Sequence, residues 1–211
     1  MVAFDPQDLA HRDVYKLLTA SVVPRPIAWV STVNDAGQPN LAPYSFFNAV
    51  CAKPPTVLFC PGIRGADLGQ KDTYHNIRAT GEFVINLVTE DLGQAMNITA
   101  TELPPEVNEF ERAGLTPIPG TVVNIPRVAE SPIQFECKLR EIVTISEDEG
   151  GGHIVIGTVV YMHFDDTVYR DGHYIDFDSY HPLGRLTGPG YCRVTERFDM
   201  IRPPSEITPR T

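Results

Sequence analysis

A loop and the helix start that follows it contain residue types that can bind an anion. The stretch GIRGADLGQKDTYHNI has Arg64 in the loop, followed by Lys71, Asp72 and Thr73. A helix N-terminus offers free N–H groups and partial positive charge, so Lys71 and the Thr73 hydroxyl could hold a phosphate there. The alternative is an ordinary N-cap by Asp72 or Thr73, with Lys71 in solvent. Asp72 would repel a phosphate unless its side chain turned inward to cap the helix.

A second stretch, NLAPYSFFNAV at residues 40–50, combines aromatic rings, a proline and small polar groups. Pro43 predicts an edge strand or a barrel rim, where unpaired backbone groups need partners that a ligand can supply. Backbone atoms around Phe46 and Asn48 could then bond to the edge of a planar heterocycle. The alternative is a core strand in which Ser45 and Asn48 satisfy turns.

Other groupings of polar residues do not match known patterns for a metal site, a hydrolase or a dinucleotide-binding site. The histidines and aspartates between 163 and 181 match no zinc or calcium spacing, and Asp-rich turns are common for conformational reasons, so we expect no metal site. Ser45 lacks the G-x-S-x-G context of a hydrolase nucleophile. No G-x-G-x-x-G follows a strand and opens a helix, which argues against a dedicated Rossmann site for NAD(P)H.

The elements that must position these stretches are mostly strands. Asp5, Pro6 and Asp8 predict the start of a first helix, which prolines 24 and 26 end. Further helices are predicted near residues 71–80, closed by Gly81, and near 91–97. Strands are predicted at 27–33, 40–50, 56–60 and 83–88.

The second half of the chain contains a covering segment and a long strand pair. Residues 102–132 are proline-rich and predict a segment that lies over the body, with one helical turn near Phe110. Apolar and polar residues then alternate from Ile133 to Ser146, which predicts a strand with one solvated face and its partner at 154–164. Several strands joined by short turns favour a small antiparallel barrel or sandwich.

Composition limits the class of protein. The chain has 211 residues, of which 42% are hydrophobic and 21% charged, as in a soluble single-domain protein. The formal charge of −10 argues against nucleic acid or an anionic membrane as the main partner. No secretory signal or membrane-length apolar run is present, so we expect a cytoplasmic protein whose four cysteines are free, small buried side chains.

Together these stretches resemble the flavin reductase-like, FMN-binding split-barrel family. The resemblance implies a mainly β fold, an antiparallel split β-barrel of Greek-key type with a few peripheral helices. It implies one domain over residues 1–211, usually assembled as a homodimer with FMN at the subunit interface. The stretches that carry it are VPRPIAWVSTVNDAGQPNLAPYSFFNAV (23–50), PPTVLFCPG (54–62), KDTYHNIRATGEFVINLV (71–88), RVAESPIQFECKLREIV (127–143) and HPLGRLTGPGY (181–191).

The resemblance also assigns residues to the flavin. Cys60 stands where relatives often have serine, and a thiol donates a weaker hydrogen bond. Arg64, His75 and Arg185 are candidates for the substrate mouth. The implied cofactor-binding residues are Ser31 and Thr32 beside the flavin, Ser45, Phe46, Phe47, Asn48, Val50 and Cys60 along the isoalloxazine ring, and Lys71, Asp72 and Thr73 at the 5′-phosphate.

The implied activity is that of an NAD(P)H-dependent flavin reductase. NADH or NADPH would pass a hydride to FMN in a transient complex, and the protein need only bind the flavin, leave one face open and tune its electronics. Reduced flavin could go to a partner monooxygenase or an electron-transfer protein. Two alternatives stay open: a flavoredoxin-like electron carrier with tightly bound FMN, and a non-catalytic flavin-binding protein.

Overall fold

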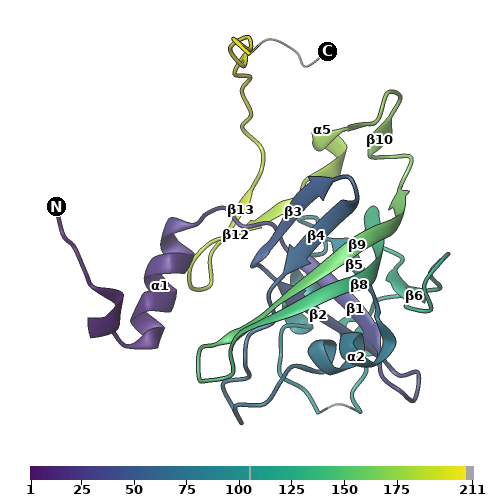
Figure 1. Ribbon diagram of the computed structural model, residues 1–211. Helices are drawn as coiled ribbons and strands as arrows, with labels where there is room; N and C mark the ends of the chain where they lie inside the picture. Colours follow the sequence, from purple (N-terminus) through teal and green to yellow (C-terminus); the bar gives the residue numbers. More distant parts are fainter. Residues whose placement is uncertain (105, 208–211) are drawn as a thin grey trace.

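The computed structural model describes residues 1–104 and 106–207, and its body is one antiparallel sheet. The seven strands follow the order β2-β1-β5-β8-β9-β4-β3, and each neighbouring pair is antiparallel (Figure 1). Their bounds are Ala28–Val33 (β1), Pro39–Tyr44 (β2), Phe47–Ala52 (β3), Pro55–Phe59 (β4), Glu82–Leu87 (β5), Ile133–Ser146 (β8) and Gly152–Phe164 (β9).

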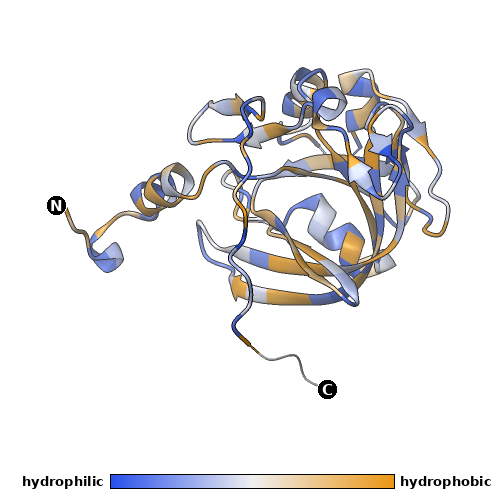
Figure 2. Ribbon diagram, turned by 90° about the horizontal axis from the view of Figure 1, so that it is seen from above, coloured by the Kyte–Doolittle hydropathy of each residue, from blue (hydrophilic) through white to orange (hydrophobic). Residues whose placement is uncertain are grey.

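The sheet curls into a barrel instead of lying flat. β2 and β4 stand five positions apart in the strand order, which would separate them by roughly 24 Å in a flat sheet. The ring of Tyr44 on β2 nevertheless lies 5.0 Å from that of Phe59 on β4. One buried cluster takes side chains from β1, β2, β4, β5, β8, β9 and α2, and Figure 2 shows the strands curving around this interior. The predicted antiparallel barrel is therefore confirmed.

Helices and short strand pairs surround the barrel. No helix in the described ranges is long and apolar enough to cross a bilayer. The short pairs are β6 (Pro117–Ile118) with β7 (Arg127–Val128), β10 (Tyr169–Arg170) with β11 (Tyr174–Ile175), and β12 (Leu183–Arg185) with β13 (Tyr191–Arg193). The helices are a 3-10 turn at Pro6–Asp8 (η1), then His11–Ser21 (α1), Asp72–Thr80 (α2), Gly93–Ile98 (α3), Glu109–Ala113 (α4) and Phe177–Tyr180 (α5).

Residues 40–50, predicted as one strand, form parts of two strands at opposite edges of the sheet. β2 ends at Tyr44, and β3 begins after a two-residue bend. The N–H of Leu41 donates to Glu109 Oε2 (3.2 Å) outside the sheet, so Pro43, two residues on, faces the same open edge. Proline suits this position because its missing N–H would have had no partner strand. The predicted rim position of Pro43 is confirmed, but the single strand is wrong.

The predicted solvated face of β8 is buried over the first part of the strand, so the prediction is wrong there. Gln134 and Glu136 were expected to face water, yet they are 5% and 0% exposed. The covering segment lies over them, and Glu136 accepts the N–H groups of residues 121–123 at 2.7, 2.7 and 3.0 Å. His163 Nε2 approaches the same carboxylate at 2.6 Å. The face becomes exposed only from Lys138 onward.

The first helix also differs from its prediction. Asp5 accepts the N–H of Gln7 (2.9 Å) and caps only η1. α1 starts about five residues later than the predicted first position, Pro6, at His11. Its apolar residues stay open to solvent: Leu17 and Leu18 are 45% and 53% exposed. Figures 1 and 2 both show α1 standing apart from the barrel. α1 is therefore a helix with an uncovered apolar side.

Candidate functional site

The residues of the predicted anion site line one small cavity. It has a volume of about 100 Å³ and lies between β2, the start of α2 and residues 99–103. Arg64, Lys71, Asp72 and Thr73 all contribute to its wall, and Tyr44 joins them from β2. The structure thus brings together the loop and helix residues that the sequence singled out.

The N-terminus of α2 has no side-chain cap among the described residues. The N-cap position is Lys71, which makes no capping bond, so the alternative of an ordinary cap by Asp72 or Thr73 is wrong. The Thr73 hydroxyl accepts from Asn40 Nδ2 (2.9 Å). First-turn N–H groups of a helix without a cap can bind an anion, and the helix dipole favours negative charge there.

Carboxylates stand beside both cations of this cavity. Lys71 Nζ lies 2.5 Å from Glu102 Oε1, and both side chains are partly exposed. Arg64 pairs with Asp67 (2.9 Å), which raises the pKa of the guanidinium, and reaches Asp72 at 3.6 Å. Asp72 therefore turns toward Arg64 and does not cap the helix. An anion entering this cavity would have to displace Glu102 from Lys71.

A larger and more apolar cavity adjoins the first. Its volume is about 570 Å³, and it lies where the barrel is split, between the β2–β3 link, the chain after β4 and the β8–β9 hairpin. Ser45, Phe46 and Cys60 line it, as the resemblance implies for the ring of a flavin. Pro43 and Tyr44 line both cavities. One ligand with a flat ring and an anionic tail could therefore occupy both.

Tyr44 stands between the two cavities with an unpartnered hydroxyl. The residue is 9% exposed, and its Oη has no hydrogen-bond partner within the described chain. Burial raises the pKa of Tyr44 well above its usual value, although the Thr73 hydroxyl, which lies near the phenol but outside hydrogen-bond geometry, acts in the opposite direction. The phenol therefore stays protonated and can donate a hydrogen bond.

Arg25 is a structural residue of this site that the sequence did not reveal. It is 5% exposed, and Nη1 donates to two carbonyls at the end of α1 (2.6 and 2.9 Å). Nη2 donates to Leu186 O (2.9 Å), Nε lies 3.3 Å from Ser45 Oγ, and the guanidinium lies over the ring of Phe46. Arg25 thus connects α1 to the rim of the larger cavity. The available signal was a lone arginine between two prolines before an apolar strand.

His153 is a second residue that sequence reasoning missed. It lines the larger cavity from β9, is 1% exposed and stacks on Tyr74 at 4.2 Å. Nε2 lies 2.5 Å from Gln70 Oε1, and Nδ1 lies 3.1 Å from the Thr144 hydroxyl. Burial lowers the pKa of His153. The imidazole is therefore neutral, with Nε2 donating to the amide oxygen and Nδ1 accepting from Thr144.

Five of the predicted flavin residues do not line either cavity in the described part of the chain. The Ser31 hydroxyl donates to Pro126 O (2.5 Å), and Thr32 Oγ1 accepts from Asn40 and Asn76, so both serve the barrel wall. The other three are on β3: Phe47 packs on the core, while Asn48 and Val50 are exposed.

The remaining candidates lie elsewhere. His75 is on the exposed side of α2. Arg185 lies in the β12–β13 hairpin, where Nη1 donates to Gly190 O (2.8 Å) and the guanidinium lies over Tyr191. Cys60 is half-buried, whereas Cys51 is exposed, so the cysteines are free but only partly the buried side chains that we expected.

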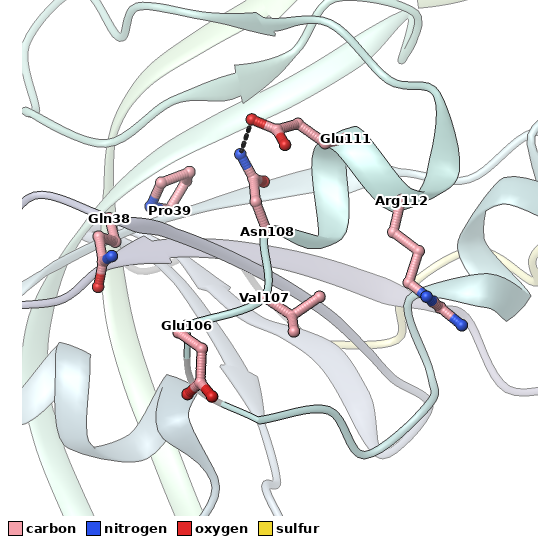
Figure 3. A pocket seen from close by; sticks show the side chains of 7 residues that line it. All are labelled: Gln38, Pro39, Glu106, Val107, Asn108, Glu111 and Arg112. Carbon is pink, nitrogen blue, oxygen red and sulfur yellow. Dashed lines mark hydrogen bonds between the residues drawn. The ribbon is translucent and has the colours of Figure 1, made fainter.

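A separate open cavity of about 580 Å³ borders α4, and it is polar. Figure 3 shows its side chains, with Glu106 and Arg112 pointing in different directions. Asn108 donates to Glu111 (3.1 Å) and caps α4 by accepting the N–H of Phe110 (3.0 Å). These groups do not converge on a ligand, so the site is assigned to the two cavities at the split.

A sequence profile of the flavin reductase like domain matches residues 20–184, which include every strand of the barrel. The chain belongs to the flavin reductase-like family. The predicted resemblance is therefore confirmed over most of its length.

Solved structures agree with this family and with the barrel. The structure is similar to nitrilotriacetate monooxygenase component B from Bacillus cereus, with 37% identity, a TM-score of 0.89 and coverage of 95% of this chain and 98% of that one. It is also similar to the Pseudomonas fluorescens 2-nitrobenzoate 2-nitroreductase NbaA, at 33% identity, TM-score 0.86 and coverage of 97% and 100%. A Shewanella frigidimarina protein with a split barrel domain, 22% identical over 96% and 100% of the two chains, shares the fold at a TM-score of 0.81.

Proposed function

We propose that this flavin reductase-like chain is an FMN-dependent oxidoreductase whose flavin is reduced by NADH or NADPH. The observation that carries the proposal is the pair of adjoining cavities that share Pro43 and Tyr44. The larger, apolar cavity suits a flat ring system. The smaller one combines an uncapped helix N-terminus with Lys71 and Thr73, which suits a phosphate.

The residues of the chain would hold FMN at both ends. Lys71, Thr73 and the first-turn N–H groups of α2 would bind the 5′-phosphate, with Arg64 beside them. Ser45, Phe46 and Cys60 would face the ring. When bound, the flavin supplies hydride acceptance, so the protein contributes binding, orientation and an open face instead of an acid–base pair.

We further propose that the working form is a homodimer. Asn48 and Val50 lie on β3, whose outer edge has no partner strand among the described residues. An exposed edge strand with apolar side chains is a surface that proteins usually cover. A second copy packed against this edge would place Asn48 and Val50 at the subunit interface, where the resemblance implies that FMN binds.

The use of the reduced flavin is proposed from the relatives. A 37% identical structure is named as a monooxygenase component, which supports transfer of reduced flavin to a partner monooxygenase. A second candidate function is direct reduction of a nitroaromatic acceptor, because a 33% identical structure over 97% of this chain is named as a nitroreductase. A nitroreductase would bind the electron acceptor itself, whereas a reductase component would pass reduced flavin to another protein.

The test is a visible spectrum followed by stopped-flow reduction. FMN added to the purified protein should bind, with its fluorescence quenched, and NADH or NADPH should then bleach its absorbance. Bleaching by neither nucleotide would remove the reductase and leave an electron carrier, if a protein donor reduces the flavin, or a binding protein, if none does. Consumption of 2-nitrobenzoate by the reduced protein alone would favour the nitroreductase.

A further inference from the structure

We propose that the Tyr44 hydroxyl is a positioning donor for the phosphate of the bound flavin. The ligand-free chain leaves this hydroxyl buried and without a partner, on a residue that lines both cavities. The inference rests on the proposed function and adds a residue that neither the resemblance nor the sequence pattern assigned.

The unpaired hydroxyl is unusual enough to need an explanation. Buried polar side chains are nearly always hydrogen-bonded, because an unpaired one loses its water without replacement. Tyr44 Oη is the buried side-chain atom of residues 1–104 and 106–207 that breaks this rule. Phenylalanine would fill the same space against Phe59 without that disadvantage. The hydroxyl is therefore explained best by a ligand that is absent from the free protein.

The position of the hydroxyl selects the anionic end of the ligand. The ring packs in the barrel core, 5.0 Å from Phe59, so it cannot swing into solvent to find water. The hydroxyl lies close to Thr73, at the start of α2, and Tyr44 is one of the residues that line the cavity that holds Lys71. Thr73 Oγ1 is already an acceptor for Asn40. A phosphate at this helix start would offer Tyr44 the acceptor that it lacks.

A neutral donor is useful here because the cavity lining carries no excess of positive charge. Asp72, Glu102 and Glu109 also line it and offset Arg64 and Lys71. Burial raises the pKa of Glu109, whose Oε2 accepts the N–H of Leu41. Selection of a phosphate must then depend on directed hydrogen bonds as well as on charge.

The experiment compares FMN with riboflavin, which lacks the phosphate, on wild type and Y44F by flavin fluorescence quenching. Y44F should weaken FMN binding about tenfold and change riboflavin binding less than about twofold. The melting temperature of ligand-free Y44F should be unchanged or higher by about 2–4 °C, because an unpaired polar group has been removed. Y180F is the matched control, since Tyr180 is 8% exposed but packs in a different cluster, with Ile133 and Val168.

Each other result has a distinct meaning. Equal FMN affinity in Y44F and wild type, or an equal loss for FMN and riboflavin, would overturn the role of Tyr44 while leaving the proposed function standing. A lower melting temperature of ligand-free Y44F would show that the hydroxyl already has a partner, and would also overturn it. Failure of wild type to bind FMN at all would remove the proposed function itself.

Discussion

The ammonium group of Lys71 is the charge on which the proposed phosphate site depends, and Glu102 already forms an ion pair with it. Lys71 Nζ and Glu102 Oε1 lie 2.5 Å apart, and the two side chains are 28% and 40% exposed. A pair this exposed contributes only about 0–1 kcal/mol to stability. Glu102 therefore has little effect on folding, but it competes with any anion for the same ammonium group.

Replacing Glu102 by glutamine should tighten FMN binding. Removal of the competing carboxylate should raise the affinity about two- to fivefold, the range expected for a partly exposed ion pair, and leave riboflavin affinity unchanged. Isothermal titration of both flavins measures this. E90Q is a control, because Glu90 pairs with Arg193 at 2.5 Å and lines neither cavity. Weaker FMN binding in E102Q would show that Glu102 orients Lys71 instead of competing for it.

At the scale of elements, Glu136 is one of two barrel carboxylates that accept backbone N–H groups of the covering segment; Glu82 accepts the N–H of Asn124 (2.9 Å). Burial alone would raise the pKa of Glu136, but the N–H groups of residues 121–123 together with His163 lower it to about 2. The folded protein thus binds this proton less readily than the unfolded chain, in which the pKa of Glu is about 4.3. The contribution of Glu136 to the free energy of unfolding is therefore fully present above about pH 4.3, and it is lost as the pH falls toward about 2.

E136Q should remove this stabilisation and its pH dependence together. Gln has one acceptor oxygen for three backbone N–H groups, so unfolding at about pH 7 should become easier by about 2–4 kcal/mol. Between about pH 4.3 and 2 the free energy of unfolding should then change less than in wild type. Urea denaturation at several pH values measures both effects. Parallel pH profiles for the two proteins would contradict the assignment.

The sequence predicts elements better than it predicts which of them meet. Local periodicity and turn chemistry predict the strands at 27–33, 56–60, 83–88, 133–146 and 154–164, the Gly81 helix end and the helical turn near Phe110. These elements are confirmed, whereas the single strand at 40–50 is not. The burial of Glu136 was missed because alternation describes one strand and not the segment that lies over it. The division of residues 40–50 was missed because neighbours in sequence were assumed to share one strand.

The candidate site shows the same limit. The sequence and the resemblance name Lys71, Thr73, Ser45 and Phe46, which line the cavities. Tyr44 lies in the stretch that the sequence singled out, but an unpaired hydroxyl is visible only once every neighbour is placed. Arg25 and His153 were missed for a related reason, since their partners lie far away in the chain.

At the scale of the whole molecule, the uncovered side of α1 supports the proposed homodimer. Leu17, Leu18 and Tyr15 are between 45% and 59% exposed on one short helix that stands apart from the barrel (Figure 1). Burial of apolar area stabilises association, at about 25 cal/mol per Å². Single copies would leave this area in water.

L18E should shift the protein toward single copies without unfolding it. A charge on a side chain that is already 53% exposed costs the monomer little, but it would be buried between two copies. Light scattering after size exclusion should give a dimer mass for wild type and a monomer mass for L18E. V122E, on the exposed part of the covering segment, should remain dimeric. A monomeric wild type would contradict the proposed assembly.

Arg25 offers a physical link between the proposed assembly and the proposed flavin site. One buried guanidinium joins the end of α1 to Ser45, so a shift of the helix on dimerisation would move the cavity rim. Any such coupling acts equally in both directions. If the helix shifts, dilution to the monomer should raise the dissociation constant for flavin. Saturation with flavin should then lower the dimer dissociation constant by the same factor.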